Sequence, residues 1–280
     1  MNLFKKNFVI LIGLVCLLLI SIILAVSIGS VKIPAGDVYT IITHKILGIN
    51  GLENTIDPSF IDIVWQIRFP RVLLGVIVGS GLALCGVVMQ GTVQNPLADP
   101  YILGISSGGT LGATFAMLMV SSIKTISSSY FSISFCAFLG ALIAAIMVFR
   151  LSSIGGRITP VKLILSGIVV NLICTAFSSL MIYMTNDNGE TRIVMDWTMG
   201  SLTSGKWDNL LIPFIVVFLG TLFFLTQFRV MNTMLLGDEA AVTLGIDLHK
   251  YRKIYLVVIS ILTGVIVASC GIIGFIGLVI

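Results

Sequence analysis

Long apolar stretches separated by short polar breaks recur along almost the whole chain. A helix that crosses the hydrocarbon core of a bilayer needs about 20 predominantly apolar residues. Lipid offers no hydrogen-bond partners for backbone N–H and C=O groups, so such stretches fold as helices that satisfy these groups internally. The sequence therefore predicts an all-α protein, a polytopic transmembrane helix bundle that forms one domain over residues 1–280. Complete spans are expected at 8–30, 63–90, 98–120, 130–150, 160–184, 208–228 and 251–270.

The composition agrees with a membrane location. Hydrophobic residues make up 57% of the chain and charged residues 10%, whereas soluble domains carry about 25% charged residues. The net charge of +4, without a run of Lys or Arg, gives no indication of a nucleic-acid partner. Gly104, Gly108 and Gly112 repeat at the spacing of small residues where two helices approach closely in lipid. We therefore expect a compact bundle.

Each end of the chain carries an apolar stretch. Lys5 and Lys6 precede the first one, which is longer than the core of a signal peptide, about 7–15 residues. We expect it to remain as the first span. An eighth apolar stretch begins at Gly271 and stops at Ile280. The expectation is therefore about seven full spans, a partial eighth and a chain that is incomplete at its C-terminus.

The orientation is predicted from Lys and Arg, which favour cytoplasmic loops. If the N-terminus is cytoplasmic, the inner loops carry more Lys and Arg than the outer loops, although the difference is small. Arg68 and Arg71 oppose the trend, because they fall at the outer mouth of the second span. Two arginines in this position require a reason of their own.

Residue types that carry catalysis or bind metals do not cluster. His44 and His249 are far apart and lack an HExxH or triad context. Residues 200–207 (GSLTSGKW) nearly match a phosphate-binding loop, but Trp207 replaces the hydroxyl that would hold Mg²⁺. We expect no enzyme activity, metal or cofactor in this chain, and any ATP and Mg²⁺ on a partner. The five cysteines lie in apolar stretches without a CxxC pattern, as packed helix residues do: Cys16, Cys85, Cys136, Cys174 and Cys270.

Two polar breaks stand out. Residues 90–100 (QGTVQNPLADP) contain two prolines and an Asn-Pro step, which predict a tight turn between spans. In the loop 229–250, Asp238 and Glu239 suit the start of a short helix, and Gly245 suits its end. Leu236, Ala240 and Leu244 share one face of that helix. Such a helix can lie on the membrane or dock in a groove of a partner, and the pattern alone does not choose between these.

Several stretches together resemble one family, the FecCD permease subunits of type II ABC importers, which take up iron-siderophores, haem and cobalamin. The stretches occur in the family's order and spacing across nearly the whole chain. They are residues 68–71 (RFPR), 90–100 with 103–108 (LGISSG), 197–202 (WTMGSL), 236–245 (LGDEAAVTLG) and 271–279 (GIIGFIGLV).

The resemblance implies an assembly in the bacterial cytoplasmic membrane. Family permeases have ten spans and pair as dimers, so a second permease subunit, identical or different, is expected. Two cytosolic ATPases bind below, and an extracytoplasmic substrate-binding protein docks above. The family's stretch at 271–279 continues into further spans, which this chain does not contain.

The resemblance also assigns residues. Arg68 and Arg71 match arginines that pair with glutamates of the binding protein, which would explain their outward position. The coupling loop that contacts the ATPase corresponds to Leu236, Gly237, Asp238, Glu239, Leu244 and Gly245. The gate and translocation path correspond to Gln90, Asn95, Pro96, Thr159, Pro160 and Asn171. For Asn171, a hydrogen bond between helices is the alternative to facing the path.

The resulting prediction is a permease that translocates an iron chelate by alternating access, driven by partner ATPases. A secondary transporter would need ionisable residues within the spans or an inverted repeat, and neither is visible. A membrane-embedded enzyme would need a His, Cys or carboxylate constellation at one depth. A truncated permease without function is the remaining alternative.

Overall fold

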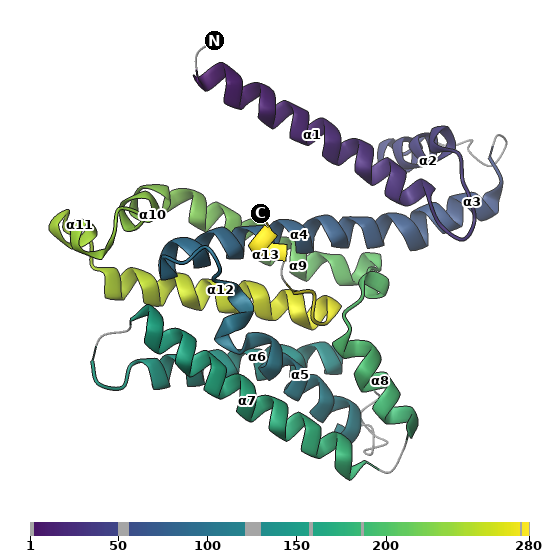
Figure 1. Ribbon diagram of the computed structural model, residues 1–280. Coiled ribbons are helices and arrows are strands. Elements are labelled where there is room, and N and C mark those ends of the chain that lie inside the picture. Colours follow the sequence, from purple (N-terminus) through teal and green to yellow (C-terminus); the bar gives the residue numbers. More distant parts are fainter. Residues whose placement is uncertain are drawn as a thin grey trace. The chain divides into compact units, whose positions relative to one another are not determined.

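The protein is described by a computed structural model that covers residues 3–49, 56–120, 130–156, 159–185, 188–274 and 276–279. Within these ranges the chain forms helices and turns and no strand, which confirms the all-α prediction (Figure 1). Six helical segments in this part are long and apolar enough to cross a membrane: Lys6–Ser27, Pro58–Val93, Phe131–Ser152, Pro160–Met184, Trp207–Thr226 and Leu248–Cys270.

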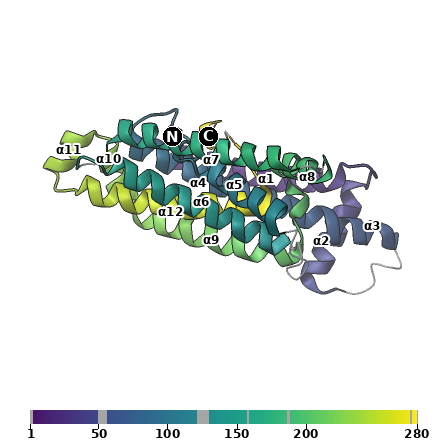
Figure 2. The same cartoon turned by 90° about the horizontal axis from the view of Figure 1, so that it is seen from below.

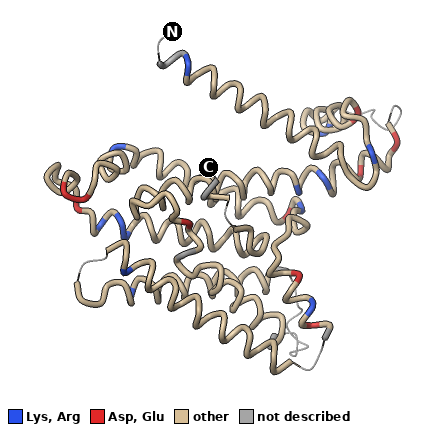
Figure 3. Tube along the Cα trace, in the orientation of Figure 1, with Lys and Arg blue, Asp and Glu red and all other residues tan. Residues whose placement is uncertain are grey.

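Most charged side chains of these helices lie toward the helix ends (Figure 3). Helix α4 (Phe69–Val93) carries Arg71 in its first turn, and α7 (Pro160–Met184) carries Lys162 in its first turn. This distribution keeps charge out of the hydrocarbon region, where a charged side chain is costly.

The chain folds as two compact units. The first contains Met1–Val76 and Gly205–Leu210, and the second contains Ile77–Ser204 and Leu211–Ile280. Helices α4 and α9 (Trp207–Thr226) contribute residues to both units.

The first unit contains α1 (Leu3–Ser27), α2 (Ala35–Leu47), α3 (Pro58–Asp62), the π-helical turn η2 (Ile63–Arg68) and the start of α4. Pro58 starts α3, and the Asp57 carboxylate accepts a 2.8 Å hydrogen bond from the Ser59 N–H. Trp65, Phe69 and Trp207 pack their rings together. The apolar core is small and gathers at one end of α1: Val26, Ile33, Val38, Ile41, Ile61, Val64 and Phe69. The rest of α1 exposes apolar side chains, as a helix facing lipid does.

The second unit is built around α12 (Leu248–Cys270), the most buried of the six long helices. Helices α5 (Ile105–Phe115) and α6 (Tyr130–Ser152) pack against it and against each other, and α7 covers α5 and α6 (Figure 2). A Cβ atom at Gly108 or Gly112 would collide with the α6 backbone at Gly140 or Cys136. The glycine spacing seen in the sequence therefore allows two helices to touch.

The expected third span, residues 98–120, is divided. It contains the 3₁₀ turn η3 (Pro100–Leu103), then α5, then the π-helical turn η4 (Ala116–Val120). Asp99 caps η3 by accepting a 2.8 Å hydrogen bond from the Tyr101 N–H, and Gly104 at φ 68° interrupts the helical path. Gly104 adopts a left-handed conformation that a helix interior excludes. Residues 105–120 are helical without a break, and this run reaches the end of a described range. The six long helices are those found within the described residues.

Shorter elements fill the connections. Helix α8 (Asn188–Thr198) and η5 (Leu202–Ser204) join α7 to α9, and α10 (Phe228–Met234) and α11 (Asp238–Thr243) join α9 to α12. After α12, Gly271 at φ 72° redirects the chain toward α13 (Ile276–Val279). Phe275 and Ile280, within the expected eighth span, lie outside the described residues.

We expect Gly112→Ala to destabilise the bundle. Overpacking a filled contact costs about 1–3 kcal/mol, and at Gly112 the obstacle is the Cys136 backbone. The control is Gly79→Ala on α4, where a Cβ meets nothing within 4 Å and helix propensity favours alanine. Thermal unfolding in detergent checks this. Equal midpoints for the two variants would contradict the close α5–α6 contact.

Candidate functional site

The 90–100 loop forms the tight turn predicted from its prolines. Helix α4 ends at Val93, and Gln94 follows in the left-handed region at φ 54°. The Asn95 N–H donates to the Gln90 carbonyl at 3.2 Å, and the Asn95 side-chain oxygen accepts from the Leu97 N–H at 2.9 Å. The turn thus supplies its own hydrogen bonds at the place where the helix stops.

The 236–245 segment has the expected short helix. Gly237 at φ 103° precedes α11, and Gly245 at φ 83° follows it. The N–H of Gly245 donates to the Val242 carbonyl at 2.9 Å, and the N–H of Ile246 donates to the Ala241 carbonyl at 3.0 Å. These two bonds end α11 at Gly245, as the sequence predicted.

An apolar surface lies on and beside α11. Leu236 and Leu244, two of the three residues predicted to share a face, are 67% and 64% exposed. Leu235 and Val242 are exposed as well, whereas Ala241 is buried. Four large apolar side chains exposed in one short polar connection form a surface that a partner can bury.

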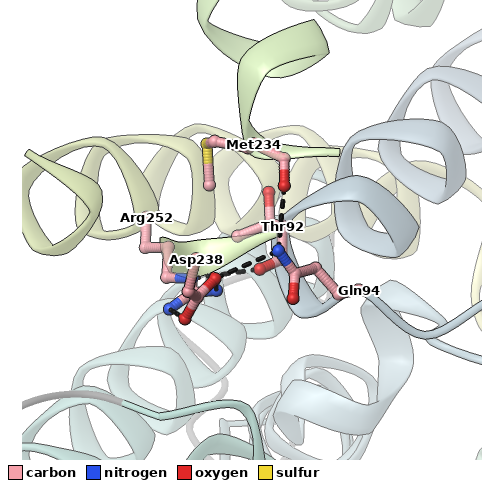
Figure 4. A network of polar contacts seen from close by, with 5 residues as sticks. All are labelled: Thr92, Gln94, Met234, Asp238 and Arg252. Carbon is pink, nitrogen blue, oxygen red and sulfur yellow. Dashed lines mark hydrogen bonds and ion pairs between the residues drawn. The ribbon is translucent and has the colours of Figure 1, made fainter. Parts of the chain in front are cut away.

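The structure brings the 90–100 loop and α11 together (Figure 4). The Gln94 side-chain amide donates to the Met234 carbonyl at 2.8 Å and to Asp238 Oδ1 at 3.0 Å. Arg252, in the first turns of α12, donates from Nη2 to Asp238 Oδ1 at 2.7 Å and from Nη1 to Asp238 Oδ2 at 3.0 Å. Its Nε donates to the Thr92 carbonyl in α4 at 3.1 Å. Three segments distant in sequence therefore meet at one ion pair.

Gln94 and Arg252 were not among the residues predicted from the sequence. Arg252 was counted only as a basic residue of a loop, and Gln94 only as part of a turn. A signal was present, because an arginine in the first turn of a span follows an acid in the preceding loop. Only the fold shows that Arg252 contacts the end of α4 and that Gln94 contacts α11 and the residue Met234 before it.

A cavity of about 640 Å³ lies beside this junction. It brings together the predicted gate residues Gln90, Asn95 and Pro96 with Leu236 and Gly237 of the 236–245 segment. The Gln90 side-chain amide also donates to the Gly277 carbonyl at 3.2 Å. Residues predicted for the gate and residues predicted for the ATPase contact thus line the same cavity.

The other predicted gate residues lie on α7. Thr159 caps this helix, with its hydroxyl accepting from the Lys162 N–H at 3.4 Å, and Pro160 is its first residue. Asn171 is exposed and lines a cavity of about 350 Å³ with Asp99 and Tyr101. Within the described part of the chain, the Asn171 side chain forms no hydrogen bond with a neighbouring helix. The role of Asn171 in the translocation path stays a prediction.

Asp99 is a buried carboxylate that the sequence did not single out. It is 4% exposed, and its Oδ1 accepts from the Tyr101 N–H, while its Oδ2 has no partner among the described residues. The Tyr101 hydroxyl donates to the Ile273 carbonyl at 3.0 Å. Asp99 thus caps the 3₁₀ turn η3 that follows it.

Arg68 and Arg71 have different surroundings. Arg68 Nη1 donates to the Val26 carbonyl at 2.8 Å and the Ser27 carbonyl at 3.1 Å, and Nη2 donates to the Val31 carbonyl. These carbonyls lie at or just beyond the C-terminal end of α1, where helix carbonyls lack partners and positive charge is favoured. Arg71 is exposed. The structure therefore gives Arg68 an intramolecular role and leaves the Arg71 guanidinium open to solvent.

The chain is similar to known permeases. The model of the FecCD transport family matches residues 17–280. The ABC transporter permease protein YvrB of Bacillus subtilis is 35% identical, over 94% of this chain and 73% of its own length. The hemin transport system permease protein HmuU of Yersinia pestis is 39% identical, over 78% of this chain and 64% of its own.

A solved structure, described as an inward-facing conformation of a metal-chelate type ABC transporter, has a similar fold. The TM-score is 0.79 and the identity 28%, over 96% of this chain and 78% of that chain. The six long apolar helices are those of a multi-pass membrane protein. The chain belongs to the FecCD transport family, the permease subunits of type II ABC importers.

We expect Arg68→Ala to loosen the C-terminal end of α1. Hydrogen bonds to charged groups are worth about 1.5–3 kcal/mol when buried and less when solvent reaches them. Gly29→Ala tests the same contact, because its Cβ would lie 2.6 Å from Arg68 Nη2. Amide hydrogen exchange over residues 24–33 should quicken in both variants and stay unchanged in Arg71→Ala. Unchanged exchange in Arg68→Ala would contradict the capping role.

Proposed function

We propose that this chain is the permease subunit of an ATP-driven importer that carries an iron chelate across the bacterial cytoplasmic membrane by alternating access. A second permease subunit shares the pathway. Two cytosolic ATPases bind ATP and Mg²⁺, and an extracytoplasmic binding protein delivers the substrate. Family membership supports the permease role. The junction at which Asp238 of α11 pairs with Arg252 of α12 and bonds to Gln94 of the 90–100 loop carries the mechanism.

The 236–245 segment is proposed as the contact with the ATPase. Leu236 and Leu244 expose apolar surface, and the carboxylates of Asp238 and Glu239 open the helix between them. A short helix with an apolar face is suited to a groove in a partner. Gly237 and Gly245 fix both ends of this helix through positive φ angles. The segment thus presents a defined shape.

The gate is proposed at the 90–100 loop and the start of α7. Gln90, Asn95 and Pro96 line the larger cavity, and Asn171 lines the smaller one. Thr159 and Pro160 set where α7 begins. Amide and hydroxyl groups at a constriction allow a hydrated, polar substrate to pass without a strong binding site. Selection of the chelate is then left to the binding protein.

Helix α4 supports a cytoplasmic N-terminus. Arg71 lies in its first turn and Gln90 in its last. Its 25 residues extend about 37 Å at 1.5 Å per residue, more than the roughly 30 Å of a hydrocarbon core. Arg71 and the 90–100 loop therefore belong on opposite sides of the membrane. With the ATPase contact in the cytoplasm, Arg71 faces outward, and α1 crosses the membrane once before it.

An iron chelate is the proposed substrate class. HmuU is named for hemin transport and the solved relative for metal chelates. Within the described residues, no group of three His, Cys, Asp or Glu side chains is placed to hold a metal ion. An iron ion that crosses inside a chelate needs no such ligands from the permease. This supports transport of the intact complex.

Uptake in cells tests the proposal. The full chain, expressed with its ATPase and binding protein, is offered a radioiron-labelled ferric hydroxamate, with hemin and cyanocobalamin in parallel. We expect iron uptake to stop when ATP is depleted and to continue when the proton gradient is collapsed. Uptake that follows the proton gradient alone would favour a secondary transporter. Transport of cyanocobalamin without ferric hydroxamate or hemin would refute the iron-chelate assignment.

Arg71→Glu tests docking of the binding protein. The resemblance implies glutamates on that partner, and close like charges cost several kcal/mol. We expect stimulation of ATP hydrolysis by the binding protein to fall about tenfold or more, while hydrolysis without the binding protein stays unchanged. Lys32→Glu, at another exposed cation of the same unit, is the matched control. Normal stimulation in Arg71→Glu would remove Arg71 from the docking site.

A further inference from the structure

We propose that Gln94, Asp238 and Arg252 form a latch that ties α11 to the 90–100 loop, so that a displacement of α11 moves the gate. The inference rests on the proposed function, in which α11 contacts the ATPase and the 90–100 loop gates the pathway. It assigns these three side chains as positioning residues. None of them needs to touch the substrate.

Arg252 is the fixed point of the latch. Its side chain is 5% exposed, and it belongs to α12, the most buried long helix of the described chain. All three nitrogens of its guanidinium donate, one to the Thr92 carbonyl and two to the Asp238 carboxylate. The planar guanidinium matches the two carboxylate oxygens, which sets direction as well as distance. A buried cation without this partner would be costly, so Asp238 is held where Arg252 places it.

Gln94 is the gate side of the latch. A non-glycine residue at φ 54° adopts a backbone conformation that L-residues disfavour. Gln94 follows α4 in this conformation, and the Asn95 N–H bond to the Gln90 carbonyl closes the turn. Two bonds from the Gln94 amide attach this turn to Met234 before α11 and to Asp238 within it. If Asp238 moves away, Gln94 loses one of these two partners. The residue that starts the loop therefore responds to the position of α11.

Asp238 is the element that can be released. Its side chain is 46% exposed, whereas that of Arg252 is 5% exposed. Water can reach the Asp238 carboxylate and take the place of Arg252 there. It reaches the buried Arg252 guanidinium less easily. Helix α11 buries only Ala241, while Val242 within it and Leu235, Leu236 and Leu244 beside it are exposed. A force on this exposed surface therefore reaches the gate through Asp238.

A purely structural role for these three side chains predicts different effects on ATP hydrolysis and transport from a role in transmitting motion. If these bonds only stabilise the fold, breaking them lowers ATP hydrolysis and transport in proportion. If they transmit motion, ATP hydrolysis persists while fewer substrate molecules cross per ATP hydrolysed. The ratio of transport to hydrolysis therefore separates the two roles.

The experiment measures that ratio in the reconstituted full complex, with radioiron-labelled ferric hydroxamate as the probe. Asp238→Asn keeps the shape of the side chain and removes its charge, and Gln94→Ala removes the loop contact but leaves the ion pair. We expect transport per ATP to fall about fivefold or more in each variant, within the usual range of coupling between sites. Lys253→Gln is the matched control, because it removes an exposed charge one residue after Arg252.

The double variant sharpens the result. If Gln94 and Asp238 act through one contact, Gln94→Ala with Asp238→Asn lowers the ratio little further than either change alone. If Asp238→Asn does not give folded protein, Gln94→Ala alone tests the latch. An unchanged ratio, or a proportional loss of hydrolysis and transport, overturns the latch. Uptake by the wild-type complex is measured first. If that uptake does not depend on ATP, the proposed function is overturned, whatever the variants show.

Discussion

The structure depends on the rule that every backbone N–H and C=O in hydrocarbon must find a partner within the protein. Long helices obey it everywhere except at their ends, so the ends need special chemistry. At the end of α4, Asn95 bonds back to Gln90 and accepts from Leu97. A few residues later, Asp99 caps the 3₁₀ turn. The polar residues of this protein gather where helices stop, and the cavities lined by the predicted gate residues lie there too.

In each of the two units, one arginine donates hydrogen bonds to carbonyl groups at the C-terminal end of a helix. Arg68 donates to carbonyls at the end of α1, and Arg252 donates to the Thr92 carbonyl in the last turn of α4. The last carbonyls of a helix carry partial negative charge and lack intrahelical donors, so a guanidinium meets both needs. Arg252 adds an ion pair with Asp238. That difference makes one arginine a local cap and the other a link between distant segments.

Features governed by local rules could be predicted from the sequence. Apolar length located the long helices, and Asp238, Glu239 and Gly245 located α11 and its end, because caps and helix dipoles act within a few residues. The division of the 98–120 stretch was not predicted, since Gly104 was counted as a packing residue and adopts φ 68°. The contacts of Arg252 and Gln94 were also missed, because residues 92, 94, 238 and 252 are joined only by the fold.

Asp99 bears on the choice between an ATP-driven importer and a secondary carrier. A buried carboxylate beside a cavity is what a coupled carrier uses to bind a proton or an ion. Here one oxygen of Asp99 is committed to the Tyr101 N–H, and Pro100 starts the turn that it caps. This N-cap role accounts for the residue without a coupling ion. Most charged side chains of the long helices lie toward the helix ends in the described chain. The FecCD family, permeases of ABC importers, matches this chain, and the exposed apolar residues in and beside α11 form a surface that a partner can contact.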